Sequence, residues 1–241
     1  MNDAARRLGV VLAAAALMGC DSLPGRPQLA HREVRPDEVE SFAVLFAQNC
    51  AGCHGGEGKG NAALPLANPV YLALADDAVL RRVIAQGVEG TLMPAFARSA
   101  GGMLTDKQVE ILVLGVRGWA QPEALQGASP PPYAAASTGE AGRGAQVFAA
   151  GCASCHGPEG RGELKAGSIV DGSYLALVSD QSLRTTVIAG RPDIGQPDWR
   201  SAGPGRPLTG EEVTDVVAWL ASMRTATPGQ PYPSRSRGGA P

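Results

Sequence analysis

Four of the five cysteines form two Cys-x-x-Cys pairs, and a histidine directly follows each pair. The two motifs run from Cys50 to His54 and from Cys152 to His156, and they contain two of the chain's three histidines. On a helical turn, positions i, i+3 and i+4 share one face. Each motif therefore presents two thiols and one imidazole to the same neighbour.

The motif C-x-x-C-H is the attachment signature of c-type haem. The two sulfurs reach the two vinyl groups on one porphyrin edge, and the imidazole points toward the iron. The sequence therefore predicts two covalently bound haem c groups. The predicted residues are Cys50 and Cys53 with the proximal ligand His54, and Cys152 and Cys155 with the proximal ligand His156.

Other uses of paired cysteines fit the sequence less well. A thioredoxin-like Cys-x-x-Cys requires a βαβ setting, and no convincing period-two strand pattern is present. Zinc and iron–sulfur sites usually draw four cysteines from closer spacing than two pairs about a hundred residues apart. Neither alternative explains a histidine after both pairs.

The chain repeats itself around these motifs, with an offset that grows only from 102 to 104 residues. The matched segments are Phe46–Gly55 with Phe148–Gly157, Tyr71–Leu74 with Tyr174–Leu177, and Leu104–Val109 with Leu208–Val213. A repeat of this kind predicts a duplicated domain. We place the first domain at residues 37–120 and the second at 139–224, joined by a Pro/Ala-rich linker at 121–138.

Hydrophobic spacing within each repeat is helical, so we expect an all-α fold. Helices are predicted over 36–48, 76–85, 139–150 and 180–189, with further helices beginning at Thr105 and Thr209. The aspartates that open the 76–85 and 180–189 segments suit N-terminal caps. Thr105 and Thr209 each precede a residue that can complete a capping box: Gln108, and Glu211 or Glu212.

On these motifs each repeat resembles a class I cytochrome c domain, a small helical fold around one haem. The resemblance implies a methionine as sixth iron ligand, in a loop after the third helix. Met93, in a Gly/Pro-containing loop and followed by Pro94, matches this position, and Met103 is its one nearby competitor. The family also crosses its first and last helices at a glycine and an aromatic. The alignment therefore predicts that Phe42 packs over Gly115 and that Trp219 packs over Gly144.

The second repeat departs from this pattern because Gln196 aligns with Met93. We number the haem of the first repeat haem 1 and that of the second repeat haem 2. On haem 2 we expect the sixth position of the iron to be open or weakly held, with Gln196, water or no ligand there. Lys165 remains an alternative that requires a distorted loop. Methionine ligation raises a haem's potential. Haem 1 is therefore expected to have the higher reduction potential. Electrons are expected to flow from haem 2 to haem 1.

The N-terminal segment has the pattern of an export signal. Arg6 and Arg7 precede an apolar run that ends at Gly19-Cys20. The run resembles a bacterial lipobox, so we predict a signal peptide at 1–19, lipidation of Cys20 and a tether over 20–36. A cleaved signal with an incidental cysteine remains an alternative. The tail, residues 225–241, is rich in Pro, Gly and Ser and is expected to be disordered.

The charge composition limits the kinds of partner that the chain can bind. A net charge of −2 without basic runs gives no support for nucleic-acid binding. The expected role is an exported electron carrier, lipid-anchored on the periplasmic face of a bacterial membrane. Its partners would be respiratory or photosynthetic redox proteins: a quinol-oxidising complex, a dehydrogenase, an oxidase or another cytochrome.

Two other functions stay open. The chain could be a cytochrome subunit of a larger redox complex, which the sequence does not separate from a free carrier. It could also be a dihaem peroxidase that reacts at haem 2, for which Glu163 and Asp193 are the nearby carboxylates. We expect no enzyme activity of the chain itself, because no other catalytic constellation is present.

Overall fold

The computed structural model describes residues 33–226. The predicted export signal, Cys20 and almost all of the predicted tail lie outside this range. Within this range, residues 33–38 and residues 39–226 belong to two separate units. In the described part of the first unit, the regular element is a short 3-10 helix, η3 (Pro36–Glu38). All helices from α2 onward belong to the second unit.

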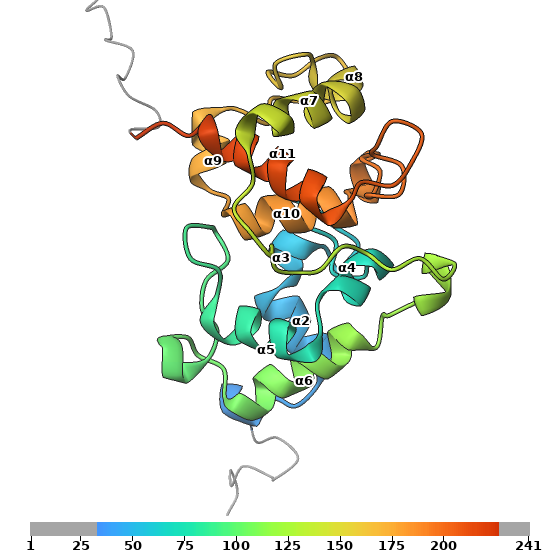
Figure 1. The fold of residues 1–241 in the computed structure, drawn as a ribbon. Helices are drawn as coiled ribbons and strands as arrows, with labels where there is room; N and C mark the ends of the chain where they lie inside the picture. Colours follow the sequence, from blue (N-terminus) through green and yellow to red (C-terminus); the bar gives the residue numbers. More distant parts are fainter. Residues whose placement is uncertain (1–32, 227–241) are drawn as a thin grey trace, which may run out of the picture. The chain divides into compact units, whose positions relative to one another are not determined.

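Both repeats fold into helices, which Figure 1 shows in chain order from blue to red. The first repeat contains α2 (Phe42–Asn49), α3 (Ala51–His54), α4 (Pro69–Leu74), α5 (Asp77–Gln86), η4 (Arg98–Ala100) and α6 (Asp106–Arg117). The second contains α7 (Ala141–Gly151), α8 (Ala153–His156), α9 (Gly172–Ala176), α10 (Asp180–Ala189), η6 (Pro192–Ile194) and α11 (Gly210–Ser222), and η5 (Pro122–Leu125) lies between them. Residues 33–226 contain no strand, only two isolated β-bridges, so the predicted all-α class is confirmed.

Side-chain caps define where the helices begin. The Asp76 side chain accepts a hydrogen bond from the Val79 amide at 2.8 Å, as predicted. Thr105 and Thr209 form complete capping boxes, with Gln108 and Glu212 respectively. Each box satisfies two amides that the first turn would leave unpaired.

Two predicted boundaries were wrong. The helix expected over 36–48 is split, because Ser41 is extended (φ −82°, ψ 119°) and α2 begins only at Phe42. The cap of α10 is Ser179, whose side chain accepts from the Ser182 amide, and not Asp180. A serine cap leaves Asp180 in the first turn, where its charge favours the helix dipole.

The first and last helices of each domain cross at a glycine, as predicted. A Cβ on Gly115 would lie 2.0 Å from the Phe42 ring. A Cβ on Gly144 would lie 2.0 Å from the Asp215 carbonyl oxygen and 2.8 Å from the Trp219 Cβ. The large and small partners have therefore exchanged helices between the repeats, which keeps both crossings close.

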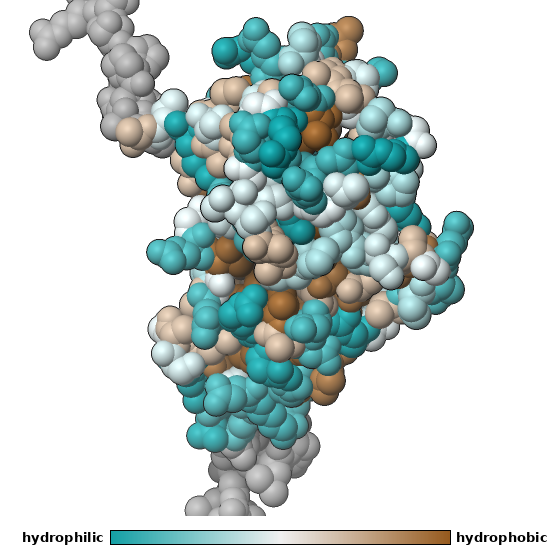
Figure 2. All heavy atoms as spheres, in the orientation of Figure 1, coloured by the Kyte–Doolittle hydropathy of each residue, from teal (hydrophilic) through white to brown (hydrophobic). Residues whose placement is uncertain are grey.

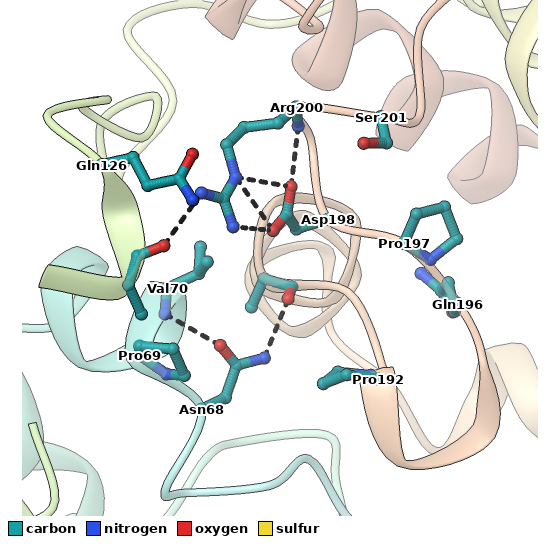
Figure 3. Close-up of a pocket in the computed structure, with 12 residues that line it drawn as sticks. Asn68, Pro69, Val70, Gln126, Pro192, Gln196, Pro197, Asp198, Arg200 and Ser201 are labelled. Carbon is teal, nitrogen blue, oxygen red and sulfur yellow. Dashed lines mark hydrogen bonds and ion pairs between the residues drawn. The ribbon is translucent and has the colours of Figure 1, made fainter. Parts of the chain in front are cut away.

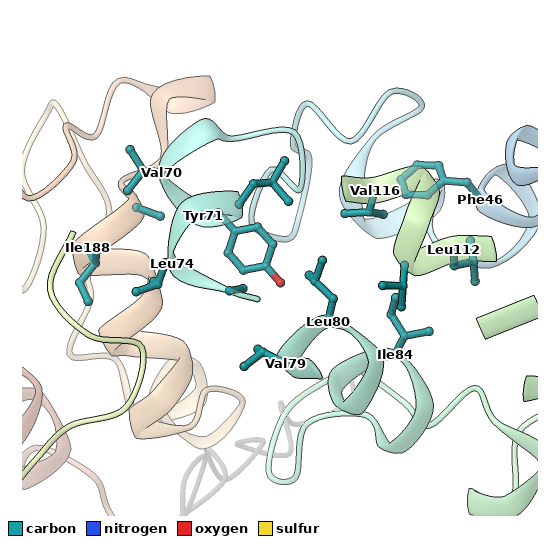
Figure 4. Close-up of a cluster of buried hydrophobic side chains, with 14 of the residues drawn as sticks. Phe46, Val70, Tyr71, Leu74, Val79, Leu80, Ile84, Leu112, Val116 and Ile188 are labelled. Atoms are coloured by element: carbon teal, nitrogen blue, oxygen red, sulfur yellow. The ribbon is translucent and has the colours of Figure 1, made fainter. Parts of the chain in front are cut away.

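The core of the first domain extends into α10 of the second. Figure 4 shows Tyr71, Leu74 and Leu80 among the buried side chains, with Ile188 of α10 beside α4. Ile188 is completely buried and belongs to the same cluster as the first domain's core. The two domains thus share apolar packing at α4 and α10.

Segment 121–138 packs onto the domains. Leu125 is 7% exposed and joins the first core cluster. The carbonyl oxygens of Pro132 and Tyr133 accept hydrogen bonds from the Arg184 guanidinium at 2.8 to 3.1 Å. A buried arginine binding backbone carbonyls holds this segment against α10.

Candidate haem sites

The first Cys-x-x-Cys-His motif forms one helical turn. Cys50 caps both α2 and α3, and its carbonyl accepts hydrogen bonds from the amides of Cys53 (3.2 Å) and His54 (3.0 Å). Both thiols are free. His54 Nδ1 lies 2.8 Å from the Leu64 carbonyl oxygen. With Nδ1–H donating to this oxygen, Nε2 carries the lone pair that an iron ligand needs.

The second motif repeats this arrangement. Cys152 caps α8 and accepts hydrogen bonds from Cys155 and His156 at 3.1 Å each, and both thiols are free. His156 Nδ1 faces the Gly167 carbonyl oxygen at 3.4 Å, a longer contact than in the first site. The imidazole of the second site is therefore less firmly oriented by its backbone partner.

Burial changes the pKa of the predicted haem-attaching cysteines and of His54. It raises the pKa of the Cys50 and Cys152 thiols to about 11. It also lowers the pKa of His54, an effect that the hydrogen bond to Leu64 partly offsets. A lowered imidazole pKa favours the neutral form, which is the form that binds iron.

The loops after the two motifs have the same backbone pattern. The Gly60 amide donates to the His54 carbonyl oxygen at 2.9 Å, and Gly162 does the same to His156 at 2.9 Å. Gly60 and Gly162 have φ of +101° and +97°, which side-chain-bearing residues rarely adopt. Each loop thus turns back immediately beside its histidine.

Met93 lies in a loop that closes directly after α5. The Val88 amide donates to the Met93 carbonyl oxygen at 3.0 Å, and the Met93 amide donates to the Thr91 hydroxyl at 3.1 Å. A Cβ on Gly87 would lie 2.6 Å from the Met93 carbonyl oxygen, so the closure requires glycine. Met103, the competing methionine, is 80% exposed in the segment before α6.

The equivalent loop of the second domain keeps this closing hydrogen bond and adds a second one. Arg191 and Gln196 exchange two backbone hydrogen bonds of 3.0 Å. The Gln196 side chain donates to the Thr186 carbonyl oxygen at 3.3 Å. Met223, the one methionine of the second repeat, ends α11 and is 39% exposed. The second domain therefore keeps the closed loop although glutamine replaces the methionine in it.

The residues of both sites suit a covalent haem. Each site offers two unpaired thiols and a half-buried histidine on one turn. Exposed large apolar side chains occur in the loops that contain or follow the predicted site residues: Leu92, Leu164 and Ile194. Figure 2 shows hydrophobic residues reaching the surface among hydrophilic ones. A porphyrin face is apolar and would be covered by such side chains.

The described part of the chain offers no comparable site to a bare metal ion. Within residues 33–226, no group of three or more His, Cys, Asp or Glu side chains is placed to hold one. A cavity of about 650 Å³ lies where α4, η5 and the 192–201 segment meet. Figure 3 shows Asn68, Asp198 and Arg200 on its walls. Two of its polar side chains are already bonded to protein: Asn68 to the Ala189 carbonyl, and Arg200 to Asp198 and the Ala124 carbonyl.

One residue near the sites, Arg191, could not be identified as important from the sequence motifs. Arg191 opens the second ligand loop, pairs with Asp193 and donates to the Asn61 carbonyl oxygen at 2.8 Å. The repeat alignment sets Val88 of the first domain against Arg191. A charged residue replacing an apolar one in a matched loop was the available signal.

Comparisons with known proteins agree with this geometry. Residues 37–114 match the family "Cytochrome C oxidase, cbb3-type, subunit III", and residues 141–224 match the family "Cytochrome c". The chain therefore belongs to the class I cytochrome c family, with two tandem domains that each bind one haem c covalently. It is a dihaem c-type cytochrome of electron transport.

Its curated relatives include subunits of cbb3-type cytochrome c oxidases. The subunit FixP of Azorhizobium caulinodans is 31% identical over 167 residues, which cover 65% of this chain and 51% of the relative. The subunit CcoP of Azospirillum sp. is 29% identical over 201 residues, covering 76% and 56%. The chain thus spans about half the length of these relatives.

Among solved structures, a chain of the Kuenenia stuttgartiensis reducing HAO-like protein complex Kustc0457/Kustc0458 is similar, with a TM-score of 0.46 and 19% identity. That match covers 80% of this chain and all of the other. Within residues 33–226 we find no helix that is long and apolar enough to span a membrane.

Proposed function

We propose that this cytochrome relays electrons to a terminal oxidase, as a two-haem unit with unequal iron ligation. The observation that carries the proposal is the difference between two otherwise matched loops, Met93 in one and Gln196 in the other. The oxidase as acceptor is suggested by the curated relatives, which are subunits of cbb3-type oxidases.

The protein's residues have separate roles in this proposal. Cys50, Cys53, Cys152 and Cys155 form the thioether bonds, His54 and His156 are the proximal ligands, and Met93 is the sixth ligand of haem 1. Each bound haem supplies a one-electron Fe(III)/Fe(II) couple. The Leu64 and Gly167 carbonyls orient the two imidazoles, and Gln196 leaves the sixth position of haem 2 open or weakly held.

Unequal ligation gives the relay a direction. A thioether ligand favours Fe(II) and raises the potential of haem 1. With both haems bound, electrons would pass from site 2 to site 1 and leave from site 1. We further propose that lipidated Cys20 holds the chain at the periplasmic face of the membrane, close to its partner. The support for this is the sequence before Cys20.

The acceptor is tested by rapid mixing. Purified holoprotein, reduced beforehand, is mixed with membranes that contain or lack a cbb3-type oxidase, and haem oxidation and oxygen uptake are followed together. We expect oxidation coupled to oxygen uptake only with the oxidase present. Oxidation that ignores the oxidase would contradict the proposal.

A peroxidase is the second candidate, because Gln196 leaves room for a reacting ligand. Asp193, one of its two candidate acid–base groups, is already paired with Arg191, which holds the pKa of that carboxyl below its usual value. A carboxylate held ionised in this way is a poor proton donor. Rapid turnover of hydrogen peroxide by the reduced protein would favour the peroxidase.

A further inference from the structure

An ion pair of the second domain docks on the haem loop of the first. Arg191 binds Asp193 through contacts of 2.6 to 3.2 Å, and both side chains are only 14% exposed. Arg191 also donates to the Asn61 carbonyl oxygen at 2.8 Å. A Cβ on Gly60 would lie 2.4 Å from the Asp193 carboxylate, so the pair rests directly on the Gly60–Asn61 backbone.

Both ends of this contact belong to candidate haem loops. The Gly60 amide donates a hydrogen bond to the carbonyl oxygen of His54, the proximal ligand. The Asn61 carbonyl that Arg191 binds belongs to the next residue along the chain. Arg191 is joined to Gln196 by two backbone hydrogen bonds. The pair therefore links the proximal side of site 1 to the ligand loop of site 2.

We propose that the Arg191–Asp193 pair sets the potential of haem 1 from the second domain and couples the two haem sites. This inference rests on haem attachment at both motifs and is independent of the direction of electron flow and of the acceptor. Electron exchange between the sites moves one electron from Fe(II) of one haem to Fe(III) of the other and needs no other reactant.

The sign of the effect follows from charge. Reduction lowers the positive charge on the iron by one unit, so a nearby cation disfavours Fe(III) and a nearby anion favours it. Arg191 supplies the cation and Asp193 the anion, and both are held against the Gly60–Asn61 backbone of site 1. Because both side chains are largely shielded from solvent, their interaction with the site is less screened than that of surface charges.

The chain supplies a matched control pair. Arg200 and Asp198 form the same short bidentate contact across one intervening residue, with side chains 29% and 17% exposed. Arg200 donates to the Ala124 carbonyl oxygen, outside both haem loops. Figure 3 shows this second pair. It has the same chemistry but no contact with the His54 loop.

The test is spectroelectrochemical titration of the holoprotein and its variants, with both haem potentials recorded. Arg191→Gln should lower the potential of haem 1, and Asp193→Asn should raise it. Each should change the equilibrium constant for reduction by roughly three- to tenfold, where tenfold equals about 59 mV for one electron. Arg200→Gln and Asp198→Asn should leave haem 1 unchanged.

Opposite signs separate charge coupling from a purely structural role. Loss of packing alone would shift haem 1 in one direction for both variants, or in neither, and this would overturn the proposal. Equal shifts in the control pair would also overturn it. Arg191→Lys, which keeps the charge, should stay closer to the wild-type potential than Arg191→Gln.

Haem content and a double variant serve as two further controls. Haem content per chain shows whether both motifs are loaded, so a failure of haem attachment is seen before any potential is read. The double variant Arg191→Gln/Asp193→Asn has no net charge change. It should return haem 1 toward the wild-type potential even if its melting temperature falls, and a potential as low as that of Arg191→Gln would overturn the proposal.

Discussion

At the scale of single residues, the two domains differ most at the position where the family places its sixth ligand. The Met93 loop and the Gln196 loop are closed by equivalent backbone contacts after a glycine with φ near +70°. The backbone therefore presents the same position in both domains, and in the proposed relay the side chain there decides what is offered to the iron. A thioether is a soft ligand, and a carboxamide is not.

Exchanging these side chains should exchange the spectra. Met93→Gln should abolish the long-wavelength absorption band of methionine-ligated ferric haem and lower the potential of haem 1. Gln196→Met should add a second such band. The measurement is the visible spectrum of the oxidised protein. A wild-type protein with two methionine-ligated haems would contradict the assignment.

Glu212 gives a residue-scale prediction about pH. The hydrogen bond from Arg206 is the main cause that lowers the pKa of this carboxyl from 4.5 to about 2. A lowered pKa stabilises the fold above pH 4.5, and this stabilisation is lost as pH falls toward 2. Because Arg206 is half exposed, we expect a contribution of about 1 kcal/mol or less.

Glu212→Gln should therefore weaken the fold at neutral pH and flatten the decline in stability between pH 4.5 and 2. Urea unfolding followed by circular dichroism at several pH values measures this. Glu211→Gln is the matched control, because its side chain is 74% exposed. An unchanged pH profile in Glu212→Gln would show that the capping box does not depend on the charge.

At the scale of elements, the helix crossings were predictable because a close approach leaves a mark in the sequence. Phe42 with Gly115 and Trp219 with Gly144 were expected from the alignment and are in contact. The capping threonines Thr105 and Thr209 could also be predicted from the sequence. The split of the first predicted helix at Ser41 was not, because apolar spacing continues across it.

The two crossing glycines should respond differently to alanine. Gly115→Ala meets the Phe42 ring, and a second change, Phe42→Leu, should recover part of the loss. Gly144→Ala meets the Asp215 backbone carbonyl, which has no smaller substitute, so shortening Trp219 should not rescue it. We expect losses of about 1–3 kcal/mol, measured by denaturant unfolding. Equal rescue at both sites would contradict this distinction.

At the scale of the whole molecule, the packing of one domain on the other was beyond sequence reasoning. The helices and motifs are local patterns, whereas the contact between α4 and α10 joins residues far apart in the chain. Asn68 illustrates the difficulty. Its oxygen caps α4 while its Nδ2 donates to the Ala189 carbonyl at 2.8 Å, and sequence reveals only the first role.

Asn68→Asp should expose this second role. Aspartate keeps the cap but cannot donate to Ala189, and the position is only 4% exposed. We expect a loss of about 2 kcal/mol in the free energy of unfolding. Asp171→Asn is the matched control, because Asp171 caps α9 at the equivalent, exposed position. A similar loss in both variants would place the effect in the caps.

The central claim is that two haems with unequal ligation share one chain. A redox titration of the purified holoprotein, with full spectra at each potential, tests it most directly. We predict two one-electron steps of equal amplitude, with the methionine-type band disappearing during the step at higher potential. Two haems with the same spectrum and the same potential would contradict the account.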